Sequence, residues 1–146
     1  TDDSLFIGMS ARGWGSIGPD AFGLQRLVWK GVTPFEVHEM HAKPNGFELT
    51  FTEPVDRQSA EDPASYRMES YTYELSSRYG GPEDDKLEVN ITSATVADDG
   101  LSVRLTIDPI RAGYVHELHL VGVRNIEGDN LLHTEAYYTL VNIPER

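Results

Sequence analysis

Apolar and polar residues alternate along much of this chain with a period of two. In residues 47–52, Phe47, Leu49 and Phe51 fall on one side and polar side chains fall on the other. Residues 101–107 repeat the pattern, which is typical of a half-buried β-strand. On this basis, together with the β-branched and aromatic residues between turn signals, strands are predicted at residues 35–42, 47–52, 66–75, 87–96, 101–107, 114–121 and 132–141.

Turn signals separate these strands. Pro44-Asn-Gly46 and Ala97-Asp-Asp-Gly100 each stand between two predicted strands and favour tight turns. The polar connection at 58–65 has room for one helical turn, and no long segment has the 3.6-residue period of a helix. About seven short strands roughly ten residues apart predict an all-β, immunoglobulin-like antiparallel β-sandwich over residues 32–146. Its predicted core consists of Phe47, Leu49, Phe51, Val103, Leu105, Ile107, Leu118 and Leu120.

The first 31 residues are organised differently. Two apolar strands, one starting at Ser4 and one at Phe22, flank a glycine-rich loop and predict a β-hairpin. A single hairpin is only marginally stable in water, so we expect it to belong to a larger sheet and the chain to be the end of a longer protein. Residues 1–31 should pack on the sandwich, on a second copy of the chain or on a preceding domain. Alternatively, the hairpin adds its strands to the sandwich and makes one integrated domain.

Composition narrows the function classes. The chain has 146 residues, enough for a core without staples, and no cysteine, which excludes disulfides, thiolate metal sites and covalent haem attachment. Its net charge of −12 argues against nucleic acid, and residues 1–30 balance to zero, so the excess acid lies in residues 31–146. No apolar run is long enough to span a membrane. An acidic surface poor in lysine suits an exported protein.

Several segments together resemble a known junction. Leu5-Phe-Ile-Gly8, Arg12-Gly-Trp-Gly15 and Gly23-Leu-Gln-Arg-Leu-Val-Trp29 resemble the end of the β-propeller in large secreted bacterial proteins of the quinoprotein sugar-dehydrogenase type. The stretch Gly46–Asp56, with Asp62-Pro-Ala-Ser-Tyr66, is similar to the immunoglobulin-like modules that follow catalytic domains in bacteria.

The resemblance implies a context rather than a reaction. It implies a non-catalytic accessory or interaction module of an exported, carbohydrate-related oxidoreductase-like protein, secreted or periplasmic. Its partner would be an upstream β-propeller, or a second copy bound through the hairpin. The catalytic and quinone-binding residues of such a propeller would lie outside this chain, so no catalytic residue and no cofactor is predicted here.

Two places could bind a ligand, with a carbohydrate as the candidate. Arg12 and Trp14 stand in the glycine-rich loop, where a planar cation beside an indole suits stacking on a sugar or a carboxylate. The same loop matches the letters G-x-G-x-x-G, but no helix follows, so a dinucleotide site is not predicted. Tyr71 and Tyr73 share one strand face and could stack on sugar rings, or alternatively pack in the core.

The alternative function is a copper- or zinc-binding redox or enzymatic domain. His38 and His41, like His116 and His119, are three residues apart, which on a strand places the two rings on opposite faces. A metal would therefore need cross-strand ligands such as His38 with His119, and no metal site is predicted. Acidic turns could hold Ca²⁺, but none has the D-x-D-x-D-G order. No G-x-S-x-G motif supports a hydrolase.

Overall fold

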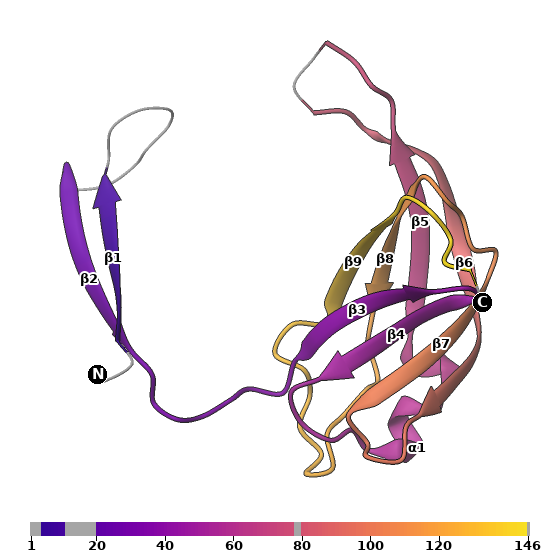
Figure 1. Cartoon of the computed structure of the whole chain (residues 1–146), viewed down its shortest axis with the longest axis horizontal. Helices are drawn as coiled ribbons and strands as arrows, with labels where there is room; N and C mark the ends of the chain where they lie inside the picture. The colour runs from indigo at the N-terminus through magenta and orange to yellow at the C-terminus, as the bar shows by residue number, and fades with distance from the viewer. Residues whose placement is uncertain (1–3, 11–19, 78–79, 146) are drawn as a thin grey trace. The chain divides into compact units, whose positions relative to one another are not determined.

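The computed structural model describes residues 4–10, 20–77 and 80–145. The chain divides into two compact units, Thr1–Thr33 and Pro34–Arg146 (Figure 1). This division falls two residues beyond the boundary expected from the sequence. Each unit is a separate piece of β-structure.

The first unit contains one antiparallel hairpin, β1 (Ser4–Ser10) and β2 (Phe22–Val28). The second contains seven strands joined by short turns and two short helices, α1 (Arg57–Ala60) and the 3₁₀ turn η1 (Pro63–Ser65). Its strands are β3 (Val37–Lys43), β4 (Gly46–Phe51), β5 (Arg67–Tyr73), β6 (Glu83–Val96), β7 (Ser102–Asp108), β8 (Tyr114–His119) and β9 (Glu135–Leu140).

The seven strands follow the order β3-β4-β7-β6-β5-β8-β9, and every neighbouring pair is antiparallel. β6 has 14 residues and serves two sheets. Its first half pairs with β5 and its second half with β7, with a register shift in each ladder. We call β3-β4-β7-β6 the front sheet and β6-β5-β8-β9 the back sheet. The predicted immunoglobulin-like antiparallel β-sandwich is confirmed.

The core lies between these two sheets. All eight residues predicted to form it are buried, and several of them have no exposed surface. Phe47 of the front sheet packs against two rings of the back sheet, His116 at 5.1 Å and Tyr138 at 5.4 Å between ring centroids. Phe35, just before β3, stacks on Phe51 and extends the core toward the start of the unit.

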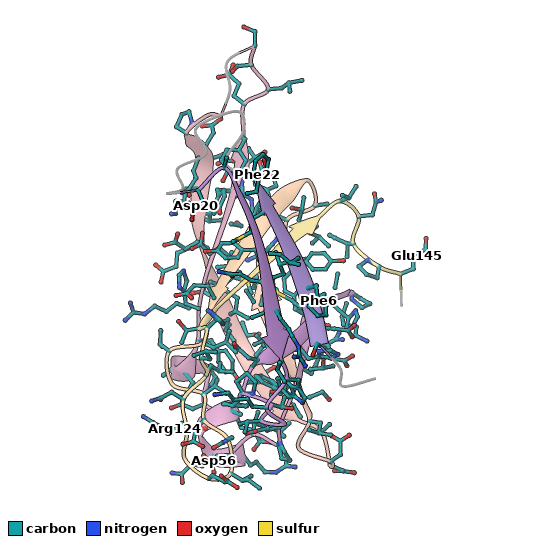
Figure 2. The ribbon with its side chains drawn as sticks, turned by 90° about the vertical axis from the view of Figure 1, so that its left-hand side faces the viewer. Phe6, Asp20, Phe22, Asp56, Arg124 and Glu145 are labelled. Atoms are coloured by element: carbon teal, nitrogen blue, oxygen red, sulfur yellow. The ribbon has the colours of Figure 1, made fainter. Side chains whose placement is uncertain are left out.

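The connection between β4 and β5 contains α1 and η1, and an aspartate side chain caps each of them. Asp56 accepts a hydrogen bond from the backbone N–H of Ser59 at 2.8 Å, and this bond lowers the pKa of the Asp56 carboxyl. Asp62 caps η1 in the same way through Ala64 N–H at 2.9 Å. Asp56 and Arg124 lie at the same end of the sandwich, where Asp56 N–H donates to the Arg124 carbonyl at 2.8 Å (Figure 2).

One strand is longer than the sequence indicates. Residues 76–86 are predicted as a loop, but β6 already begins at Glu83. Its acidic start pairs with the end of β5, and Asp85, with φ of 48°, is held there by Arg111 and Tyr114. Within residues 4–10, 20–77 and 80–145, no helix is long and apolar enough to cross a membrane.

Candidate functional site

The hairpin presents apolar side chains on both of its faces. In the register of β1 with β2, Leu5 lies opposite Leu27, and Ile7 and Met9 follow on the same face. The other face carries Phe6, Phe22, Leu24 and Val28. These side chains are exposed in the structure, Leu24 to 72%. A strand that is apolar on both faces is normally covered on both sides.

Among the described strands, β1 and β2 form a sheet of their own and pair only with each other. Figure 2 labels Phe6 on β1 and Phe22 on β2. Arg12 and Trp14, which the sequence singles out as binding residues, lie outside the described residues. Trp29, directly after β2, is exposed.

Tyr71 and Tyr73 lie side by side on the outer face of the back sheet. Their rings meet edge to face with centroids 5.6 Å apart, although a register shift interrupts the β5–β6 ladder at this point. Tyr71 is only 4% exposed, and the Lys86 ammonium lies 5.5 Å from the centre of its ring. Tyr73 is 51% exposed. Tyr73 can therefore contact a ligand, whereas Tyr71 supports it from below.

Glu117 of β8 stands beside these rings and receives hydrogen bonds from two directions. His119 Nε2 lies 2.9 Å from Glu117 Oε1, and the hydroxyl of Tyr137 on β9 lies 3.4 Å from the same oxygen. Burial raises the pKa of Tyr71, and the neighbouring Tyr73 and Glu117 raise it further. Burial also raises the pKa of Tyr137, as does Glu117. The phenols of Tyr71 and Tyr137 are therefore neutral hydrogen-bond donors at pH 7.

Lys86 joins β5 to β6 on the same face. Its ammonium lies 2.5 Å from Glu69 and 2.9 Å from Glu83, and these two carboxylates raise its pKa, Glu69 more than Glu83. The face thus combines exposed tyrosine rings with carboxylates and one cation, and we call Tyr71, Tyr73, Lys86, Glu117 and Tyr137 the tyrosine face. Rings of this kind can stack on a sugar, and carboxylates can accept bonds from its hydroxyls.

The histidines do not converge. His116 points into the core and His119 lies on the outer face of the same strand, which confirms the expected split for this pair. His38 and His41 are both exposed on β3, where a register shift between Val37 and Glu39 interrupts the alternation. His41 pairs with Glu39 at 2.9 Å on the surface of β3. No group of three or more His, Cys, Asp or Glu side chains arranged to hold a metal ion occurs within the part of the chain that the structure describes.

The acidic turns have structural partners. Asp85 binds the guanidinium of Arg111 and accepts a 2.6 Å bond from the Tyr114 hydroxyl, and both contacts lower its pKa, the tyrosine bond more. Asp99 accepts a bond from Leu101 N–H at 2.9 Å within its own turn. Asp129 accepts a bond from the buried Asn125 at 3.2 Å. These contacts account for the positions of Asp85, Asp99 and Asp129.

Sequence reasoning did not identify His116 as a core residue. The signal was present, because His116 has the same parity along its strand as Leu118 and Leu120, which were both predicted to be buried. It also did not identify Arg111, whose long side chain joins Asp85 to Ser70 across the back sheet. No periodic pattern indicates such a contact between residues far apart in sequence.

Comparison with known proteins finds similarity in fold only. No family model matches the chain, and no curated protein matches it. Three solved structures of the bacterial S-layer protein SbsC are similar. They are the fragment 31–844 (TM-score 0.56, 18% identity over 73% of this chain), domains 1–6 (0.55, 20%, 75%) and the N-terminal part (0.57, 18%, 74%). The chain spans 14% of each of the first two and 24% of the third. At this identity the likeness supports the β-sandwich fold alone.

Proposed function

We propose that this chain is a non-catalytic interaction module of an exported, carbohydrate-related bacterial protein, and that the β1–β2 hairpin joins it to other β-structure. The observation that carries the proposal is the hairpin itself, which is apolar on both faces and forms a two-stranded sheet of its own among the described strands. Another β-strand could pair with an edge of the hairpin, and another apolar sheet could pack on its faces. The similarity of the sandwich to domains of a surface-layer protein supports a place at the cell surface.

The partner is proposed to be a β-sheet, either the preceding propeller-type blades that the sequence resemblance implies or a second copy of the chain. Residues 1–30 carry no net charge, whereas residues 31–146 carry all twelve excess negative charges. The hairpin can therefore approach another apolar sheet without the like-charge repulsion that would keep two sandwiches apart.

The hairpin proposal is tested by changing its apolar surface. We expect Leu24→Glu to weaken self-association of the intact chain at least about tenfold, since it removes one large apolar contact and introduces a charge there. Sedimentation equilibrium over a range of concentrations measures this. Leu132→Glu is the matched control, because Leu132 is 65% exposed on the sandwich and the same substitution there should change nothing.

Tryptophan emission gives an independent signal from the hairpin unit. Both tryptophans, Trp14 and Trp29, lie in the first unit and the sandwich has none. Association through the hairpin should therefore shift the emission to shorter wavelength as concentration rises. If the intact chain and Leu24→Glu have equal solubility, the same monomer mass and unchanged emission, the hairpin does not join copies of the chain. If adding the preceding domain in the same polypeptide then leaves the emission unchanged, the proposal is wrong.

Carbohydrate binding at the tyrosine face is a second candidate function. The specific observation in its favour is that Tyr73 and Tyr137 are exposed on the same sheet face as the carboxylate of Glu117. The net negative charge favours a neutral sugar over an acidic one.

This second function is tested by titrating the chain with neutral oligosaccharides and recording NMR shifts. Tyr73→Ala and Tyr137→Ala should each weaken binding about tenfold, the value of one aromatic stacking contact. Glu48→Ala, on the outer face of the front sheet, should bind like the parent. If neutral hexoses and N-acetylhexosamines at millimolar concentration cause no NMR shift changes in the parent protein, this function is ruled out.

A further inference from the structure

His116 is a titratable side chain placed inside the core. It is 0% exposed, and its ring packs against Phe47 across the space between the two sheets. Neither ring nitrogen has a hydrogen-bond partner among the described residues. A buried imidazole without partners is costly, and an apolar side chain of similar size would fill the same space without that cost.

The backbone of Tyr114 favours a positive charge on the ring, whereas the side chains next to it on the neighbouring strands are uncharged. On the neighbouring strands its register partners are Ser70 of β5 and Tyr138 of β9, both uncharged, and β4 contributes Phe47. The charged group that acts on it is Arg111, from the loop before β8. The Arg111 guanidinium donates to Ser70 Oγ at 3.1 Å, and its own counter-ion, Asp85, is already engaged.

Burial and the Arg111 cation both disfavour protonation of His116. Burial lowers the pKa of His116 below 6.5 and the Arg111 cation lowers it further, while the backbone of Tyr114 offsets part of the effect. The folded chain therefore holds this ring neutral where the unfolded chain already protonates it. Since the unfolded state then binds more protons, the stability of the fold decreases as the pH falls below 6.5 and levels off below the folded-state pKa.

We propose that His116 is an acid-sensitive element of the sandwich: neutral and packed between the sheets at pH 7, and forced out of that position when it is protonated. Opening should begin at β9, because β9 is the edge strand of the back sheet and Tyr138 on it covers the pocket beside Phe47. The device loosens the sandwich in mildly acidic surroundings. It is independent of the hairpin and of any sugar site.

The test is the pH dependence of unfolding in the full chain. The unfolding equilibrium constant of the parent is measured with urea between pH 7.5 and 4.5. We expect the part of its pH dependence that is due to His116 to raise this constant by up to about tenfold for each pH unit below 6.5. His116→Phe should lack this part of the pH dependence while keeping the acid response that carboxylates give to both proteins. His41→Gln is the matched control, because His41 is exposed on β3 and its removal should leave that part in place.

An NMR titration of the parent keeps the proposal falsifiable even if His116→Phe does not fold. The ring of His116 should titrate below 6.5, and the β9 amides should be the first to change as it does. The proposal is overturned if the ring titrates at or above 6.5. It is equally overturned if His116→Phe folds and shows the same pH slope as the parent.

Discussion

At the scale of single residues, Asn125 organises the loop between β8 and β9. It is buried, and its amide nitrogen donates to Glu53 at 2.8 Å and to Asp129 at 3.2 Å. Its side-chain oxygen accepts from the backbone N–H groups of Glu127 at 3.1 Å and Asp129 at 2.8 Å. One side chain thus adds four hydrogen bonds to the backbone bonds of this irregular segment.

We expect Asn125→Ala to lower the free energy of unfolding by about 2–3 kcal/mol, because it leaves several polar groups in the loop without partners. Asn125→Asp should also destabilise the fold at pH 7, since it places a carboxylate between those of Glu53 and Asp129, and acid should relieve this effect. Urea denaturation measures both changes. Asn130→Ala is the control, because that side chain is exposed, and its effect should stay within about 0.5 kcal/mol. An equal cost for both alanine variants would contradict this role.

At the scale of elements, the turn between β3 and β4 allows β4 to lie close to β7. Gly46 opens β4 with φ of 156°, and a Cβ atom built there would stand 2.0 Å from the carbonyl oxygen of Leu105. The pairing Gly46–Thr106 therefore requires a residue without a side chain.

We expect Gly46→Ala to cost about 2–5 kcal/mol of stability, because the backbone of β4 or β7 must move to make room. Gly113→Ala separates this clash from backbone strain alone. Gly113 has φ of 86° but open space around it, so its cost should be only about 1 kcal/mol. Thermal unfolding of the two variants measures the difference, and similar melting temperatures would show that the contact with β7 is not tight.

The sequence predicts elements well where one face of a strand is buried. Alternation at Phe47, Leu49 and Phe51 correctly predicts both the strand and its core side. It fails where polar residues pair with residues remote in the chain, as near the start of β6, where Arg111 holds Asp85. It also cannot show that Tyr71 is covered while Tyr73 is exposed, since Lys86 approaches the Tyr71 ring from another strand.

At the scale of the whole molecule, the edge strands of the sandwich differ from the strands of the hairpin. In the sandwich, β3 and β9 are the edge strands of the front and back sheets, and they lie against each other. β3 also carries charged residues that discourage further pairing. In the hairpin, Arg26 of β2 is the one charged residue on β1 and β2. The part of the chain that we propose to pair with neighbours is thus separate from the core of the sandwich.

The strand shared by the two sheets has a consequence for how errors are avoided during folding. Val89 is buried in the half of β6 that pairs with β5, and Val96 is buried in the half that pairs with β7. A slip of β6 by one residue would turn both valines toward water at once, because side chains alternate along a strand. A wrong register of β6 in one sheet would therefore also expose a core residue of the other sheet.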